Sequence, residues 1–579
     1  MKFLLSSLFL LCSSPLVLAS TPVQADREPE AATGYYQQQL VEAQHFMVSA
    51  AHPLATQAGL RVLEQGGSAM DAAIAVQLVL GLVEAQSSGI GGGAFILHWD
   101  QEGQQMTAFD GRETAPKAAT EQLFMQGDTA MPWREAYVGG KSVGVPGLFA
   151  VMYQAHQRYG KLVWEQLFED AIQLASEGFP VSDRMARQLA VGWNQGIQHS
   201  PEASQYFYPD GEPLQAGAVI TNQSYADILR QVAEQGPQAF YQGENAAAMV
   251  KAVQQASVNA GALALTDLAA YQAVERKPVC GSYRSYTICG MPPPSSGGIA
   301  VVQILGLLER FEVGQLAPDS VEAIHLFGVA SQLAFADRDH YVADSDFVEV
   351  PIQQLIEPAY LASRSQLIQT DKALAEVSPG SPVTELARLS TSSPELSNTT
   401  HLSIVDAKGN AVSMTSSIEN VFGSGLMVNG YLLNNQLTDF SLSPKLHGEL
   451  VANRVQGGKR PRSSMSPVMV FDEAGTLRIV LGSPGGSRII NYVAQTLVAL
   501  IDWHLDIQSA ISLPRVTHRN DFLALEKGTA IEHHQSALEQ MGHQVRVIDL
   551  NSGLHGIVIL DTGLQGGADP RREGQVLGH

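Results

Sequence analysis

Apolar residues recur along this chain with two different periods. Residues 51–90 carry them at helical spacing, and the turn at 66–68 divides this stretch into two predicted helices. Residues 94–109 instead form two short apolar runs joined by a turn at 100–103, which predicts two strands. A further helix is predicted over 321–341. The chain therefore mixes helices with strands from its first part onward.

The second part of the chain opens on a stretch without periodicity. Residues 376–398 are rich in Ser, Pro and Thr, which is typical of a linker or exposed loop. Apolar and polar residues then alternate on both sides of the turn 407–410, which predicts a β-hairpin. A strand at 477–481 and a helix at 488–503 are predicted to follow. We expect a mixed α/β architecture, and we find no internal repeat.

The first 25 residues resemble a signal peptide. Lys2 precedes the apolar run 3–11. Cleavage is expected after Ala19 or Ala25, because both positions offer the small residues of a signal-peptide cleavage site. The alternative, an N-terminal membrane anchor, is disfavoured because the run is short and broken by 13–15. We expect an exported protein, periplasmic or secreted, without a stable membrane anchor.

Composition excludes some partners. Hydrophobic residues make up 45% and charged residues 16% of the chain, which is an ordinary globular balance. Lys plus Arg number 35 against 57 Asp plus Glu, giving a net charge of −22. A surface this acidic disfavours nucleic-acid binding, because it repels the phosphate backbone.

Two cysteines, Cys280 and Cys289, remain beyond the predicted signal segment. Export permits a disulfide between them. If residues 281–284 form the hairpin turn, however, Cys280 faces Ser285, so this geometry does not favour the bond. A zinc site is disfavoured because no nearby His or Cys completes a ligand set.

The strongest chemical candidate is Thr399, where the linker meets the hairpin. Its hydroxyl could attack the preceding carbonyl of Asn398, and water could cleave the resulting ester. The freed α-amine, with an ordinary pKa of about 8, could then act as base for the same hydroxyl. The plainer interpretation is a strand start rich in β-branched residues.

Two glycine-rich segments are also candidates. Residues 482–487 (GSPGGS) follow an apolar strand and open a helix, so their backbone N–H groups suit an oxyanion. A plain strand-to-helix turn is the alternative, and a phosphate loop is disfavoured because no Gly-Lys-Ser/Thr follows. Residues 89–93 (GIGGG) lack the strand and helix that a dinucleotide site requires. Arg112, Asp439, Ser463 and Ser464 are weak signals when taken singly.

Together these segments resemble the γ-glutamyltransferase (γ-glutamyltranspeptidase) family of N-terminal-nucleophile hydrolases. The resemblance runs in order from about Ala51 to Arg572. The segments that carry it are AHPLAT (51–56), GGSAMDAA, SSGIGGG, GRETAP (111–116), GVPG (144–147), PPPSSGG (292–298), NTTHLSIVD (398–406), LLNNQLTDFS (432–441), KRPRSSMSP (459–467), GSPGGSR (482–488) and GGADPRR (566–572).

The resemblance implies one four-layer αββα domain made from an autocleaved precursor. Residues 26–398 would form the large subunit and 399–579 the small catalytic subunit of a heterodimer. Thr399 would be the nucleophile, with Gly485 and Gly486 as oxyanion donors. The implied substrate contacts are Arg112, Ser463 and Ser464 for the α-carboxylate, and Gln436, Asp439 and Glu419 for the α-amino group.

Two positions depart from the family pattern. Ser417 stands where the family usually has a Thr that hydrogen-bonds the nucleophile, and it keeps the hydroxyl. Glu419 stands where well-studied members have an Asn, and it adds a second carboxylate beside Asp439. The family's lid would lie between Asp439 and Lys459.

The implied function is that of a γ-glutamyltransferase or glutathione hydrolase. Its partners would be γ-glutamyl small molecules such as glutathione, with water, an amino acid or a peptide as acceptor, and no metal or organic cofactor is needed. One alternative is a glutaryl or cephalosporin-type acylase of the same family, which the carboxylates of Asp439 and Glu419 disfavour. The other is an unprocessed binding protein for γ-glutamyl peptides.

Overall fold

Two seven-stranded sheets form the centre of the protein. The structure is a computed structural model that describes residues 35–382 and 398–579. The predicted signal segment and most of the predicted linker lie outside these ranges. In strand order, the first sheet contains β1 (Val41–Ala43), β24 (Gly563–Ala568), β23 (His555–Leu560), β19 (Leu477–Gly482), β18 (Val468–Phe471), β11 (Tyr286–Gly290) and β10 (Val279–Tyr283).

The second sheet carries the start of the predicted small subunit at its centre. Every neighbouring pair of strands in it is antiparallel. Its order is β25 (Gln575–Gly578), β2 (Met47–Ala50), β12 (Thr399–Val405), β13 (Ala411–Ser417), β3 (Gly93–Asp100), β4 (Gln105–Gly111) and β9 (Val274–Arg276).

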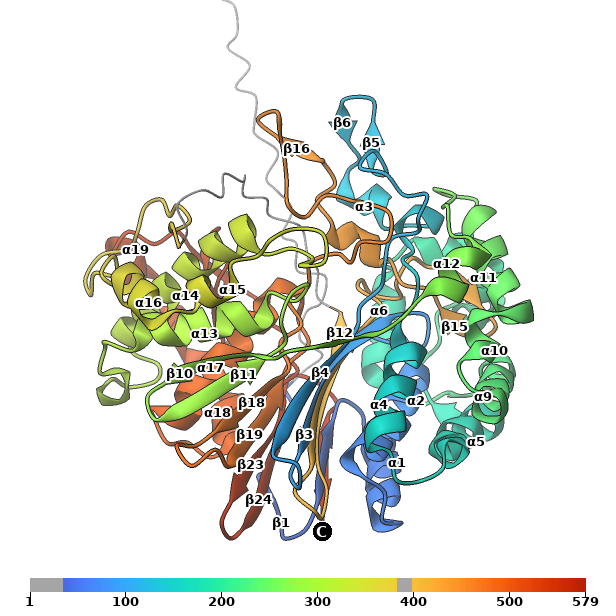
Figure 1. Cartoon of the computed structure of the whole chain (residues 1–579), viewed down its shortest axis with the longest axis horizontal. Helices are drawn as coiled ribbons and strands as arrows, with labels where there is room; N and C mark the ends of the chain where they lie inside the picture. The colour runs from blue at the N-terminus through green and yellow to red at the C-terminus, as the bar shows by residue number, and fades with distance from the viewer. Residues whose placement is uncertain (1–34, 383–397) are drawn as a thin grey trace, which may run out of the picture.

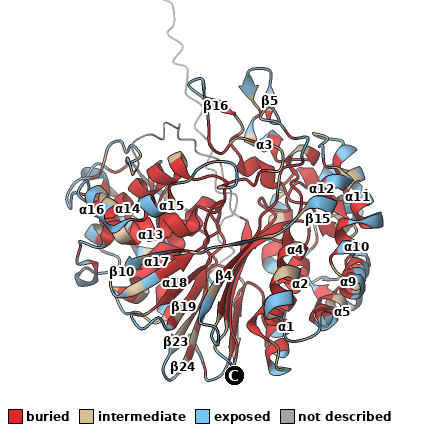
Figure 2. Cartoon of the chain, viewed as in Figure 1, coloured by how far each residue is buried: buried red, intermediate tan, exposed pale blue. Residues whose placement is uncertain are grey.

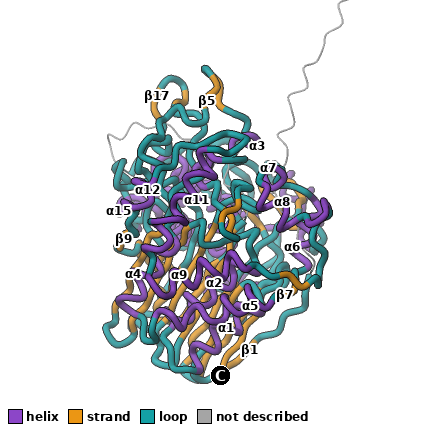
Figure 3. The backbone as a smooth tube through the Cα atoms, turned by 90° about the vertical axis from the view of Figure 1, so that its right-hand side faces the viewer, coloured by secondary structure: helices purple, strands orange, loops and turns teal. Residues whose placement is uncertain are grey.

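Helices cover the outer faces of both sheets (Figure 1). The first sheet is covered by α13 (Gly297–Leu308), α14 (Val321–Tyr341) and α17 (Ile489–Ile501). The second is covered by α1 (Pro53–Glu64), α2 (Ala69–Val83), α4 (Leu148–Tyr159), α5 (Glu169–Glu177) and α9 (Gln223–Gln235), which lie in front of the strands in Figure 3. The layers are therefore α, β, β and α, as expected.

The period of two in the strands divides side chains between two cores. On β3, Phe95 and Leu97 face the first sheet, whereas Ala94 and Ile96 face the helices of the second. Both faces are buried, so β12 and β13 are buried along their whole length, and the interior is continuous between the layers (Figure 2).

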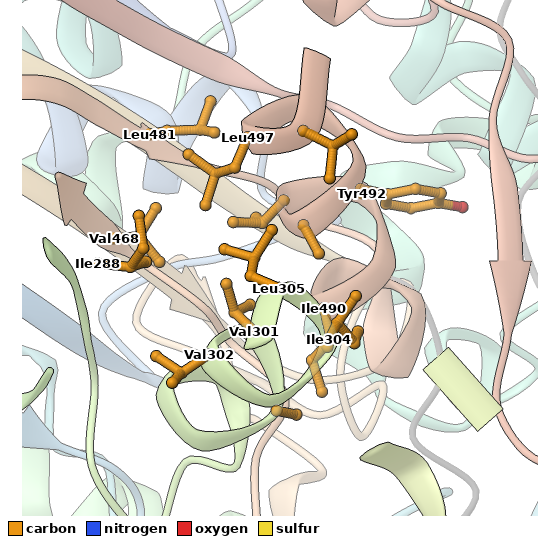
Figure 4. Packing of buried hydrophobic residues seen from close by; sticks show 14 of the residues in the cluster. Ile288, Val301, Val302, Ile304, Leu305, Val468, Leu481, Ile490, Tyr492 and Leu497 are labelled. Atoms are coloured by element: carbon orange, nitrogen blue, oxygen red, sulfur yellow. The ribbon is translucent and has the colours of Figure 1, made fainter. Parts of the chain in front are cut away.

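The outer core of the first sheet is an interlocked apolar layer. Figure 4 shows Leu305 and Val301 of α13 next to Leu497 of α17, with the strand residues Val468 and Leu481 beside them. Burying a side chain of this size stabilises the fold by about 1.5–3 kcal/mol. This layer holds α17, and with it the glycine turn that precedes the helix, in a fixed position.

The hairpin β10–β11 corrects the expectation about the cysteines. Tyr283 pairs with Tyr286, so the turn is at 284–285, later than expected. Arg284 adopts a φ of 52° there. Cys280 therefore lies directly opposite Cys289, and the two form a disulfide.

Smaller elements lie outside the two central sheets. An exposed hairpin, β16 (Lys445–Leu446) and β17 (Glu449–Leu450), lies in the expected lid region. The remaining helices of six residues or more are α6 (Asp183–Val191), α8 (Pro201–Phe207), α11 (Gly243–Gln254), α12 (Leu265–Ala270), α16 (Pro358–Ser365), α18 (Ile507–Ser512) and α19 (Gln535–Gln540). Within the described ranges, no helix is long and apolar enough to cross a membrane.

Candidate active site

Thr399 is the first residue of β12, and the antiparallel register sets its surroundings. It pairs with Ser417, the last residue of β13. The Thr399 hydroxyl donates a hydrogen bond to Ser417 Oγ at 3.3 Å, and Ser417 Oγ donates to the carbonyl oxygen of Asn398 at 2.8 Å. One hydroxyl thus contacts both the candidate nucleophile and the carbonyl that it would attack.

A small polar cavity of about 250 Å³ opens beside Thr399. It brings together nearly all the residues that the sequence singled out, from six separate segments. Its lining is Arg112, Thr399, Ser417, Glu419, Gln436, Asp439, Ser463, Ser464, Met465, Gly486 and Ile489. The sequence did not indicate Met465 and Ile489, which are apolar and follow the candidate residues along the chain.

The glycine turn lies between β19 and α17. Gly485 has a φ of 132° and Gly486 a φ of 59°, a backbone that other residues adopt only with strain. A Cβ on Gly485 would also lie 2.7 Å from the ring of Tyr492. Gly486 lines the cavity, and Gly485 is its chain neighbour outside the lining. The expected oxyanion donor Gly486 therefore shares the cavity with Thr399.

One cation and one anion meet in the cavity wall. Arg112, which follows β4 and is 1% exposed, donates from Nη2 to Asp439 Oδ2 at 2.5 Å. Gln436 Nε2 donates to the same oxygen at 2.7 Å. The backbone carbonyl of Arg462 accepts a further bond from Arg112. These contacts fix both charged groups before any ligand arrives.

The two serines are held by a segment far away in sequence. Ser463 exchanges backbone hydrogen bonds with Pro294 and Ser296 of the PPPSSGG motif. Arg338 of α14 donates to Ser464 Oγ at 2.7 Å and to Ser296 Oγ at 2.9 Å. The sequence did not indicate Arg338, whose only signal there is a charged residue within a largely apolar predicted helix.

Glu419 stands two residues after Ser417, in a left-handed conformation with a φ of 77°. Its backbone N–H donates to Ser417 Oγ at 2.9 Å, and Asn435 donates to its carboxylate. Glu419 is 2% exposed and lines the cavity together with Asp439. The second carboxylate is therefore part of the cavity wall.

Glu113 lies behind Arg112 and is fully buried. No other described residue donates a hydrogen bond to its carboxylate oxygens, and Arg112 Nη1 is 3.9 Å away. Burial raises the pKa of Glu113 to about 8, against the opposing effect of Arg112. Among the described residues, no cluster of His, Cys, Asp and Glu is arranged to hold a metal ion.

A sheet sandwich with a threonine at the start of a central strand, facing a glycine turn, is the architecture of an N-terminal-nucleophile hydrolase. The family model for gamma-glutamyltranspeptidase matches residues 55–579. The chain belongs to this family.

Relatives and solved structures agree with this assignment. The chain is 37% identical over 543 residues to a glutathione hydrolase proenzyme of Escherichia coli K12, covering 92% of this chain and 91% of that protein. A cephalosporin acylase from Bacillus halodurans matches with a TM-score of 0.83 at 28% identity, over 94% of this chain and 97% of that one. Helicobacter pylori gamma-glutamyltranspeptidase matches with a TM-score of 0.55 at 33% identity, over 61% of this chain and 97% of that one.

Proposed function

We propose that this protein is an exported γ-glutamyltransferase and glutathione hydrolase that cuts itself between Asn398 and Thr399. The observation that carries the proposal is the single cavity in which Thr399, Ser417, Gly486 and the Arg112–Asp439 pair meet. The names of the relatives, among them a glutathione hydrolase proenzyme, support the same activity.

Self-cleavage begins with attack of Thr399 Oγ on the carbonyl carbon of Asn398. Negative charge develops on the carbonyl oxygen, which already accepts a hydrogen bond from Ser417 Oγ. The C–N bond breaks, the acyl group moves to Oγ, and the Thr399 nitrogen takes a proton to become an amine. Water then hydrolyses the ester, which frees the Asn398 carboxylate and restores the Thr399 hydroxyl.

Turnover reuses the same hydroxyl. Its proton passes to the freed α-amine while Oγ attacks the γ-carbonyl of the substrate, and the backbone N–H groups of Gly485 and Gly486 stabilise the oxyanion. The α-ammonium returns the proton to the leaving amine. Water or an acceptor amine then releases the γ-glutamyl group from the ester.

The charges in the cavity wall match the amino-acid end of a γ-glutamyl group. Arg112, Ser463 and Ser464 would hold its α-carboxylate. Asp439, Gln436 and Glu419 would hold its α-amino group. The leaving group would extend outward from the cavity.

Hydrolysis of glutaryl or cephalosporin-type side chains is the second candidate, because the fold matches a cephalosporin acylase over 94% of the chain. Glutaryl groups lack the α-amino group, so Asp439 and Glu419 would face an apolar methylene. We therefore expect faster turnover of a γ-glutamyl anilide than of a glutaryl anilide. The reverse preference would favour the acylase.

The first test is a denaturing gel of the purified protein, with N-terminal sequencing of each band. Two bands are expected, the smaller one starting at Thr399, and the Thr399→Ala variant should remain uncut and inactive. A wild-type chain that stays whole but binds γ-glutamyl ligands would instead support the binding-protein hypothesis. The N-terminus of the larger band tests export, since it should begin after Ala19 or Ala25.

A further inference from the structure

A buried polar network surrounds Asn398, outside the substrate cavity. Its central residue is Arg184, near the start of α6, which is 0% exposed and absent from the cavity lining. Glu84, at the end of α2, and Ser87 are also buried, at 1% and 0% exposed. Ser87 opens the SSGIGGG segment, but the sequence assigned a role to none of these three residues.

The side-chain amide of Asn398 is held at both ends. Its Oδ1 accepts hydrogen bonds from Arg184 Nη2 and Ser87 Oγ, each at 3.0 Å. Its Nδ2 donates to the backbone carbonyl of Gln86. If the amide were turned by 180°, its NH₂ group would face the donors of Arg184 and Ser87, so these contacts define one orientation. Asn398 is itself 0% exposed.

The same Arg184 reaches across the bond between Asn398 and Thr399. Its Nη1 is paired with Glu84 and donates to Ser87 Oγ at 3.0 Å. Glu84 Oε2 in turn accepts a hydrogen bond from Thr400 Oγ1 at 2.9 Å. One Arg–Glu pair thus holds the residue before the bond and the second residue after it.

The position of Arg184 is itself fixed from the C-terminal end of the chain. Its backbone N–H donates to Glu573 Oε1 at 2.8 Å. The neighbouring Arg572 donates from Nη1 to the carbonyl oxygen of Thr399 at 3.4 Å. The peptide unit to be cut is therefore held by segments that meet only once the whole sandwich has folded.

We propose that Arg184 is a positioning residue for self-cleavage, which acts through the Asn398 side chain to hold the Asn398 carbonyl against Thr399 Oγ. This inference rests on the proposed self-cleavage at that bond. Attack on a carbonyl requires the two atoms to meet at a defined angle, and small displacements slow such steps steeply. Charge-assisted hydrogen bonds from a buried arginine supply that rigidity.

The test is a double-mutant cycle on the rate of self-cleavage after cell-free synthesis. Arg184→Met and Asn398→Ala should each slow the appearance of the two subunits, by about 10- to 100-fold. If Arg184 acts through Asn398, the double variant should be no slower than either single variant. Slowdowns that multiply in the double variant would overturn the proposal.

Two further variants serve as controls for effects on folding. Arg184→Met combined with Glu84→Gln avoids a buried carboxylate without its cation, and it should process as slowly as Arg184→Met. Arg364→Met breaks another Arg–carboxylate pair, with Asp337, 3.1 Å apart and 11% and 3% exposed. It should lower Tm but leave processing at the wild-type rate. Equal slowing by Arg364→Met would overturn the proposal, because processing would then follow stability alone.

Failure of the inference can be told apart from failure of the proposed function. If Thr399→Ala is still cut before residue 399, the self-cleavage mechanism is wrong whatever Arg184 does. If Thr399→Ala stays whole while Arg184→Met is cut at the wild-type rate, only the role of Arg184 is wrong. A loss of kcat/KM in the processed Arg184→Met enzyme as large as its loss of processing rate would also contradict a role confined to the precursor.

Discussion

Two buried Arg–Glu pairs lie near Thr399, and their arginines donate to different partners. Arg112 has Glu113 at 3.9 Å and donates to Asp439 in the cavity wall. Arg184 is hydrogen-bonded to Glu84 and donates to Asn398, outside the cavity. The first pair lies at the proposed substrate cavity, and the second lies against the residue before the proposed cleavage bond.

The difference suggests a division of labour between two reactions at one hydroxyl. A substrate must enter and leave, so its cation lies on a cavity. The peptide bond proposed to be cut is part of the chain, so the cation near it, Arg184, can be fully buried and held by several hydrogen bonds. Burial raises the pKa of Glu84, while Arg184 and Arg572 lower it. Ser417 lines the cavity and also donates a hydrogen bond to the Asn398 carbonyl, so its mutation tests both proposed reactions.

The largest effect is expected at Asp439. Asp439→Asn removes the charge that would hold the substrate ammonium and leaves Arg112 without its buried partner. We expect kcat/KM for a γ-glutamyl anilide to fall by about 100- to 1000-fold. Self-cleavage should proceed at the wild-type rate, as measured by the band pattern over time.

Asp346→Asn provides the control for that variant. Asp346 is also paired with an arginine, Arg276 at 2.7 Å, but its side chain is 46% exposed and outside the cavity lining. It should leave kcat/KM nearly unchanged. Impaired self-cleavage in Asp439→Asn would contradict this division, because a residue of the substrate cavity would then also position the bond that is cut.

Ser417→Ala should slow both reactions. It removes the hydrogen bond that the Asn398 carbonyl accepts at 2.8 Å, and we expect self-cleavage to slow by about 100-fold. Turnover of the processed fraction should fall less, since the glycine turn supplies the oxyanion donors there. Ser417→Thr keeps the hydroxyl and should restore both rates. Loss of turnover without loss of processing would contradict the shared role.

The periodicity of the sequence predicted a mixed α/β chain and several of its elements, whereas the four layers and most of the cavity residues were implied only by the family resemblance. Strand alternation and glycine turns are local, so β3, β12 and the segment 482–487 could be located directly. Arg112 and Asp439 could be assigned only through the family resemblance, because their pairing joins residues distant in sequence. The roles assigned to these residues stay predictions.

Other features could not be predicted from local pattern. The centre of the β10–β11 turn lies two residues later than expected, and that shift decides whether Cys280 meets Cys289. Arg184 comes from a short helix, and nothing in its local sequence indicates Asn398 as its partner. Contacts of this kind follow from the assembled sandwich rather than from periodicity.

A smaller effect is expected at Glu419. Glu419→Gln removes one of two carboxylates in the cavity but keeps an oxygen that accepts from Asn435. We expect kcat/KM for the γ-glutamyl anilide to fall by about tenfold or less. The ratio of glutaryl to γ-glutamyl turnover should rise, because a group without an ammonium then meets less negative charge. An unchanged ratio would mean that Asp439 alone selects the α-amino group.

The smallest effect concerns Glu113 and appears in stability. Burial raises its pKa from 4.5 to about 8, with Asp439 and Asp110 adding to the effect and Arg112 opposing it. Between these pH values the folded protein keeps a proton that the unfolded chain releases, so this group's contribution to stability falls as pH rises. Buried histidines such as His52, whose pKa is lowered to about 4, act in the opposite direction between pH 4 and their ordinary pKa.

The informative quantity is therefore the difference in Tm between wild type and Glu113→Gln. Wild type should lose about 1–3 °C relative to the variant between pH 5 and pH 8. A constant difference over that range would mean that Glu113 is ionised throughout, and that Arg112 is paired to it as closely as Arg184 is to Glu84.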